Sequence, residues 1–295
     1  MAQFLLSRVH AQNRGVYPLG MSPLNWGLMP APGSTYTNQV LTYARDEAKG
    51  DDGASLPVTG SNTVILDMNT FASVSTGTIL GGARYSASAT LPFARNDLTS
   101  NLNGNRNGGA GSGDSYYPPL ILGWKRDPDA VRVLCGFLAP TGRFVAGGTD
   151  NVGSGYWTLA PSSGQTFYLT RSQSLAASAY EWYEIHSRQE GTRTHPGDTF
   201  NPDYSLMRFF PVSRRHLQIG MGVAAYGARQ TTAKTGPQIT PDQSLDPLRG
   251  QRARFRNKSG ISKSKAEFRC KVFRGIRGSI DLPGVFPRFS GSISF

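Results

Sequence analysis

The sequence is poor in cysteine and in charge, and it has no long apolar run. Of its 295 residues, two are cysteine and 17% are charged. Cys135 and Cys270 are far apart and form no CxxC pair, which argues against a zinc site or a redox motif. No stretch of about 18 apolar residues occurs, which excludes a membrane-spanning helix. The strands of a membrane barrel, about 9 to 11 residues of alternating apolar and polar side chains, stay open.

Motifs of common catalytic and cofactor sites are also missing. There is no GxGxxG after a strand, no GxxxxGK[ST], no GxSxG and no HExxH. His186, His195 and His216 lack the spacing of metal ligands. We interpret His195 and Asp198 as partners in a local turn rather than as a catalytic dyad. We therefore predict no enzymatic activity, no cofactor and no metal site.

Alternating runs are the main feature that is present. In residues 83–93, apolar side chains such as Tyr85 and Leu91 alternate with polar ones, and this two-residue period predicts a strand long enough to cross a membrane. The same period recurs in residues 217–225, 131–139 and 64–74, and in the last of these Met68 and Val74 fall on the apolar side that we expect to face lipid. The polar face of the first run supplies the candidate lumen-lining residues Arg84, Ser86 and Ser88.

Polar stretches rich in turn formers separate these runs. Asn101–Ser115, Glu47–Asn62 and Thr231–Gly250 predict long loops in water, whereas Gly81–Gly82 and Pro211–Arg215 predict short connections. Long loops and short turns together are typical of an outer-membrane barrel. The glycine-rich part of the first loop lacks the lysine and the following helix that phosphate binding requires, so we expect a mobile loop there.

The C-terminal seven residues form the most specific pattern. In residues 289–295, odd positions are apolar or glycine, even positions are serine, and the chain ends on an aromatic residue. A lipid-facing last strand needs this alternation, and an aromatic side chain suits the membrane interface at its end. We therefore predict that Phe295 belongs to the barrel-closing strand and serves as an assembly signal.

Positive charge is concentrated near the C-terminus. The net charge is +12, and residues 249–295 contain twelve Lys or Arg and two acids, a net of +10. On strands, these basic residues share one face, which in a barrel is the lumen or an extramembrane rim because a lipid-facing Arg costs about 2 to 4 kcal/mol at the midplane. The field of such a lumen favours anionic solutes. The candidate lumen-lining residues here are Arg252, Arg254, Arg256, Arg269 and Lys271.

Aromatic and acidic residues lie close together around position 182. Glu181 and Glu184 have opposite parity, so a regular strand places them on different faces, which argues against a paired-carboxylate hydrolase. We interpret Tyr180, Trp182 and Tyr183 as part of an interfacial aromatic girdle.

Several segments resemble the MetA-pathway phenol-degradation family of outer-membrane transporters, also called SphA-like. The resemblance implies a barrel of roughly 12 strands and import of hydrophobic or aromatic growth substrates. Residues 252–260 and 274–286 depart from the family pattern, and residues 284–295 regain it. The segments that carry the resemblance are LMPAPG (28–33), ARYSASATLPFARN (83–96), LILGW (120–124), FLAPTG (137–142), GYWTLAP (155–161), PGDTF (196–200) with Asp203 and Tyr204, and VAAY (223–226).

The sequence thus predicts an all-β protein, a transmembrane antiparallel β-barrel over residues 28–295. Residues 1–27 form a lead segment whose first part resembles the end of a truncated secretory signal. The predicted function is passive uptake of small hydrophobic or aromatic compounds across the bacterial outer membrane. The expected partners are membrane lipid and lipopolysaccharide, the barrel assembly machinery and the solute, with no nucleic acid. The alternatives are a non-transporting structural or adhesion barrel and a secreted soluble β protein whose basic tail binds anionic polymers.

Overall fold

The computed structural model describes residues 16–18, 21, 25–49, 55–100, 104–146, 148, 150–192, 194–213, 217–232, 269–273 and 288–294. Every regular element in these residues is a β-strand, and none of them forms a helix long and apolar enough to cross a membrane. The strands are β1 (Gly33–Lys49), β2 (Ser55–Ile79), β3 (Ala83–Ser100), β4 (Gly104–Ser112), β5 (Ser115–Arg126), β6 (Asp129–Ala139), β7 (Thr158–Tyr168), β8 (Leu175–His186), β9 (Thr199–Ser213), β10 (Leu217–Tyr226), β11 (Arg229–Gln230), β12 (Arg269–Phe273) and β13 (Arg288–Ser294).

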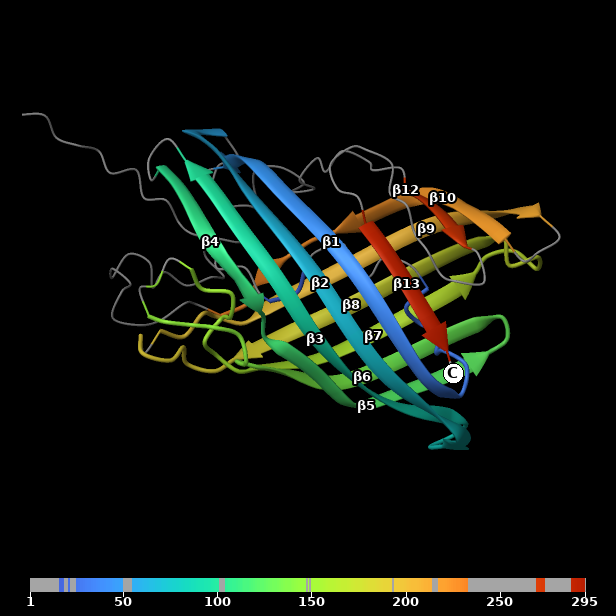
Figure 1. Cartoon of the computed structure of the whole chain (residues 1–295). Helices are drawn as coiled ribbons and strands as arrows, with labels where there is room; N and C mark the ends of the chain where they lie inside the picture. Colours follow the sequence, from blue (N-terminus) through green and yellow to red (C-terminus); the bar gives the residue numbers. More distant parts are fainter. Residues whose placement is uncertain are drawn as a thin grey trace, which may run out of the picture.

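The strands form one antiparallel sheet in which most strands pair with the strand that precedes or follows them in the chain. The path runs β12-β10-β9-β8-β7-β6-β5-β3-β2-β1-β13, with β11 paired to β9 and β4 paired to β3. The sheet curves so that β1 to β4 lie in front of β5 to β10 (Figure 1). This up-and-down order is the architecture of membrane barrels. The described residues contain thirteen strands, of which β11 has only two residues, so the number is close to the roughly twelve that the family resemblance implied.

The first strand pairs with the last one. In the register of β1 with β13, Thr35 lies opposite Ser294 and Tyr36 opposite Ile293. The prediction that the C-terminal strand adds to the edge of the first strand is therefore confirmed. Phe295 itself lies outside the described residues.

Side chains alternate between a buried inner face and an exposed outer face. The outer face of β7 to β9 carries the exposed side chains of Leu159, Phe167, Ile185, Leu206 and Phe210. Soluble monomers rarely expose so much contiguous apolar surface, whereas a lipid-facing band requires it.

The predicted sidedness holds in β3 and β10. Tyr85 and Leu91 are exposed while Ser86 is buried, and in β10 Met221 is exposed while Gly220 is buried. Cys135 in β6 is also exposed, which fits a small lipid-facing hydrophobe.

The predicted sidedness of residues 64–74 is wrong. Met68 and Val74 are buried in β2, whereas Phe71 is exposed. The face that carries Phe71 also carries Asp67 and Asn69, whose polar atoms are satisfied locally. Asn38 Nδ2 donates to Asp67 Oδ1 at 2.6 Å, and Tyr36 Oη donates to Asn69 Oδ1 at 2.6 Å. Mutual hydrogen bonding reduces the cost of placing these groups on an outer surface.

Two predicted loops are mostly strand. The glycine-rich segment expected to be mobile forms β4, which pairs with β3 from Phe93 opposite Ser112 to Ser100 opposite Gly104. Likewise, β1 and β2 extend through most of the predicted loop Glu47–Asn62 and leave five residues between them. Backbone hydrogen bonds hold such a ribbon whatever its side chains are, so composition underestimated strand length. β2 has 25 residues, more than twice the 9 to 11 that a membrane crossing needs.

Candidate functional site: the lumen and its N-terminal segment

The described part of the N-terminal segment lies against the inner face of β5 to β9. Asn25 N donates to Ser178 Oγ at 3.2 Å, and Gly27 N donates to Thr166 Oγ1 at 3.1 Å. Ser178 and Thr166 are both buried inner-face residues of the wall. Hydroxyl groups of the wall thus accept hydrogen bonds from backbone N–H groups of residues 25–27, which do not belong to a strand.

Glycines make this close contact sterically feasible. A Cβ atom at Gly27 would collide with the backbone carbonyl of Ala130 and would lie 2.6 Å from Thr166 N. On the wall, a Cβ at Gly164 would lie 2.6 Å from Trp26 O, and one at Gly123 would collide with Met29. Real Cβ contacts are never this short, so any side chain at these positions would push the segment away from the wall.

Aromatic rings fill the middle of the lumen. The ring of Tyr17 stacks on Trp182 with centroids 5.2 Å apart, and Trp26 stacks on Tyr180 at 4.6 Å. Tyr17 also contacts Tyr180 at 5.8 Å, and Tyr116 contacts Trp182 at 5.0 Å. Tyr17, Tyr180 and Trp182 are each at most 5% exposed. The segment and the wall therefore form one aromatic cluster (Tyr17, Trp26, Tyr116, Tyr180 and Trp182).

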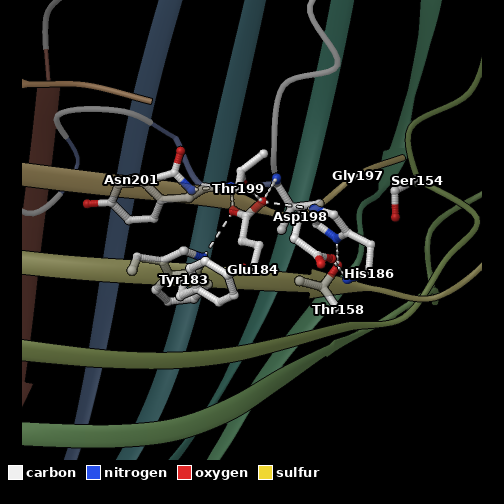
Figure 2. A network of polar contacts seen from close by, with 12 residues as sticks. Ser154, Thr158, Tyr183, Glu184, His186, Gly197, Asp198, Thr199 and Asn201 are labelled. Atoms are coloured by element: carbon white, nitrogen blue, oxygen red, sulfur yellow. Dashed lines mark hydrogen bonds and ion pairs between the residues drawn. The ribbon is translucent and has the colours of Figure 1, made fainter. Parts of the chain in front are cut away.

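A buried carboxylate joins the segment to the wall. Glu184 is fully buried, and its Oε1 accepts hydrogen bonds from Tyr17 N at 2.7 Å and Trp182 Nε1 at 3.0 Å. Its Oε2 accepts from Val16 N at 3.0 Å and Thr199 Oγ1 at 2.7 Å. Figure 2 shows Glu184 between Thr199 and His186, among polar side chains of β8 and β9. A buried carboxylate requires such partners, and two of the four come from the segment.

His186 continues this network toward the loops. Its Nε2 lies 3.2 Å from Glu184 Oε2, and its Nδ1 lies 2.8 Å from Thr158 Oγ1. With the ring proton on Nε2, Nδ1 accepts from the Thr158 hydroxyl, so both nitrogens are satisfied. Asp198, in the connection between β8 and β9, accepts a hydrogen bond from His186 N at 3.0 Å (Figure 2).

The connection between β6 and β7, residues 140–157, packs against this end of the lumen. Asp114 accepts hydrogen bonds from Gly142 N at 3.0 Å and Ser154 N at 2.7 Å, which fixes the connection at both of its ends. The ring of Tyr156 meets His186 edge-on with centroids 4.9 Å apart. Burial, together with the nearby carboxylates of Glu184 and Asp114, raises the pKa of the Tyr156 hydroxyl, which therefore stays protonated.

Three polar groups beside the aromatic cluster have no hydrogen-bond partner among the described residues. They are the hydroxyls of Tyr116 and Ser162 and the Nε atom of Arg132, all buried on the inner face. The guanidinium of Arg132 lies over the Trp26 ring at 4.3 Å, a cation–π contact. Unpaired buried groups are costly, so this part of the lumen is suited to water or a polar solute.

A family model described as "Putative MetA-pathway of phenol degradation" matches residues 45–253. The chain belongs to this family. The fold is similar to the crystal structure of an outer-membrane channel from Pseudomonas putida F1, with a TM-score of 0.60, 12% identity, and coverage of 93% of this chain and 99% of that one. BamA from Haemophilus ducreyi lacking POTRA domains 1–3 matches at 9% identity over 88% of this chain and 69% of that chain, but its TM-score of 0.25 supports no comparison. No curated protein sequence matches the chain.

The chain is thus a member of the phenol-degradation family, and its fold is similar to that of an outer-membrane channel. Among the described residues, no group of three or more His, Cys, Asp or Glu side chains could hold a metal ion.

The predicted lumen-lining residues occupy different environments in this family member. Ser86 is buried, Ser88 is half-buried and Arg84 is exposed at the start of β3. In β12, Arg269 is paired with Gly222 and Lys271 with Gly220. Arg252, Arg254 and Arg256 lie outside the described residues. Lumen lining by all eight residues stays a prediction.

The structure corrects two interpretations of residues near the network. Tyr180 and Trp182 are buried inside, so they do not belong to an interfacial girdle. His195 Nδ1 accepts from Gly197 N at 3.2 Å, whereas the Asp198 carboxylate accepts from His186 N, so the predicted pairing of His195 with Asp198 is replaced by two separate bonds. The prediction that Glu181 and Glu184 lie on opposite faces is confirmed by the alternating burial of β8.

Sequence reasoning missed Glu184, Asp203 and Tyr17 as lumen residues. Glu184 and His186 have the same parity in β8, as Asp203 and Asn201 have in β9, and this was a usable signal for a shared polar face. Nothing in the sequence signals Tyr17, because its partners lie at least 160 positions away.

Proposed function

We propose that this protein is a passive channel for small hydrophobic or aromatic compounds, and that the N-terminal segment occupies its lumen between passages. The observation that carries the proposal is the inner face itself, where aromatic rings alternate with hydroxyls and carboxylates beside the segment. Rings supply stacking surface for an aromatic solute, and the polar groups keep the passage wettable. Diffusion down a gradient through such a lumen requires no bound cofactor.

The proposal is tested by measuring solute flux while an engineered disulfide reversibly holds the N-terminal segment against the wall. In a background with Cys135 and Cys270 replaced by serine, Asn25→Cys and Ser178→Cys introduce two thiols where Asn25 N and Ser178 Oγ lie 3.2 Å apart. The variant is reconstituted in liposomes, and uptake of 4-methylphenol and ionic conductance are measured with and without dithiothreitol. We expect flux in the reduced form and little in the oxidised form, while either single-cysteine variant is insensitive to reductant.

A non-transporting barrel is the second candidate, because aromatic side chains fill the middle of the lumen in this structure. The same experiment decides between the two. If the reduced variant and the serine-substituted parent both transport no more solute and no more ions than protein-free liposomes, the channel proposal is wrong and the structural barrel replaces it.

A further inference from the structure

The side chain of Tyr17 is a phenol held inside the lumen of the channel. Its ring stacks on Trp182 and contacts Tyr180, and its hydroxyl donates a hydrogen bond to Asp203 Oδ2 at 2.5 Å. Tyr17 is 5% exposed and Asp203 is fully buried. The lumen wall therefore recognises both features of a phenol, the π-face and the hydroxyl proton.

The backbone of Tyr17 is held separately from its ring. Tyr17 N donates to Glu184, whereas the hydroxyl donates to Asp203, on the adjacent strand β9. Glu184 and Asp203 belong to different strands and accept from different ends of the residue. A small molecule that carries only the ring and the hydroxyl could therefore satisfy the Asp203, Tyr180 and Trp182 part of the site without the peptide.

We infer that the pocket of Tyr180, Trp182 and Asp203 is a binding site for neutral single-ring phenols, which replace the Tyr17 side chain in it. The inference rests on the proposed channel function and names its solute class. The closest free analogue of the Tyr17 side chain is 4-methylphenol. Toluene lacks the hydroxyl and would leave the buried Asp203 carboxyl without that donor.

The inference predicts that Tyr17 and free phenols compete. While the Tyr17 side chain fills the pocket, a free phenol can bind only to the molecules in which the pocket is empty. The apparent affinity is therefore the intrinsic affinity multiplied by the empty fraction. In Tyr17→Ala the internal competitor is gone, so we expect 4-methylphenol to bind the full-length, detergent-solubilised protein at least about tenfold more tightly than wild type. Tyr17→Phe keeps the ring but loses the hydroxyl, and we expect an intermediate affinity. Binding is measured by titration calorimetry against empty micelles.

A change of ligand and a substitution in the lumen wall together distinguish a site that recognises the phenol hydroxyl from a simple apolar cavity. In Tyr17→Ala, 4-methylphenol should bind at least about tenfold more tightly than 4-methylanisole, which has the same ring but no proton to donate. Asp203→Asn in the same background should reduce this preference, because a neutral acceptor forms a weaker hydrogen bond than a carboxylate. Trp26→Ala is the matched control, since it also empties an aromatic position but one that is not paired with Asp203, and it should bind both ligands equally.

Equal affinity of Tyr17→Ala for 4-methylphenol and 4-methylanisole would overturn the inference, and this comparison needs no second protein variant. A preference that persists unchanged in Asp203→Asn, with the folded form verified by heat modifiability, would also overturn it. The proposed function is judged separately by flux. Transport of aromatic solutes without selective phenol binding would support the channel and contradict the binding site. Selective binding without transport would support the binding site and contradict the channel.

Discussion

Replacing Glu184 with glutamine should release the N-terminal segment, while the strands of the wall keep their backbone hydrogen bonds. The carboxylate accepts from Val16 N and Tyr17 N, one on each oxygen. Glutamine has one acceptor oxygen, and its NH₂ group would face one of these N–H donors. At least one hydrogen bond to a charged group is therefore lost, which is about 1.5 to 3 kcal/mol. Because 1.4 kcal/mol is about tenfold in an equilibrium constant, the ratio of released to docked segment should rise about 10- to 150-fold.

The ratio of released to docked segment is measured as single-channel conductance in planar bilayers. If the docked segment blocks ions, Glu184→Gln should raise the open fraction of single channels by this factor until it saturates. Glu181→Gln is the matched control, because Glu181 lies on the opposite face of β8 from Glu184 and accepts a hydrogen bond from Ser163 Oγ at 2.8 Å. Both variants should show the heat-modifiable mobility of a folded barrel. Wild-type conductance in a folded Glu184→Gln protein would refute the reasoning that Glu184 holds the segment.

Three further outcomes are expected. Leu91→Arg should reduce the folded, heat-modifiable fraction much more than Ser88→Arg, since a lipid-facing Arg costs about 2 to 4 kcal/mol at the midplane; equal tolerance would contradict the assigned sides of β3. Gly27→Ala should raise conductance, because the new Cβ collides with Ala130 O, and unchanged conductance would argue against the tight contact. Deletion of Phe295 should lower the folded protein in outer-membrane fractions more than Ser292→Ala does, and equal amounts would remove its role as an assembly signal.

Local patterns predicted most of the strands and the pairing of the first strand with the last. The two-residue period of β3 and β10 placed Leu91 and Met221 outside, as observed. The period determines which residues share a face but not which face is inside. In β2 both faces carry large apolar side chains, with Met68 inside and Phe71 outside. The sequence of such a strand is ambiguous, and only its neighbours decide its orientation.

The lumen contents could not be predicted because they depend on contacts between distant parts of the chain. Tyr180 and Trp182 were expected at the membrane interface, because aromatic girdles are typical of outer-membrane barrels. Their burial becomes favourable only when Tyr17 and Trp26 arrive from a segment outside the sheet. Neither the period of β8 nor its composition contains information about that segment.

The acidic side chains among the aromatic rings of the inner face can be hydrogen-bonded in two states of the lumen, with the N-terminal segment docked or displaced. With the segment docked, Glu184 and Asp203 accept hydrogen bonds from Tyr17 and Val16. With the segment displaced, water or a hydroxylated solute can donate to the same oxygens, and a water-mediated bond is nearly as favourable as a direct one. A lumen closed by apolar contacts alone would oppose opening by the full hydrophobic cost of exposing them. Carboxylates at the contact lower that difference, because they are solvated when the lumen is open and paired when it is closed.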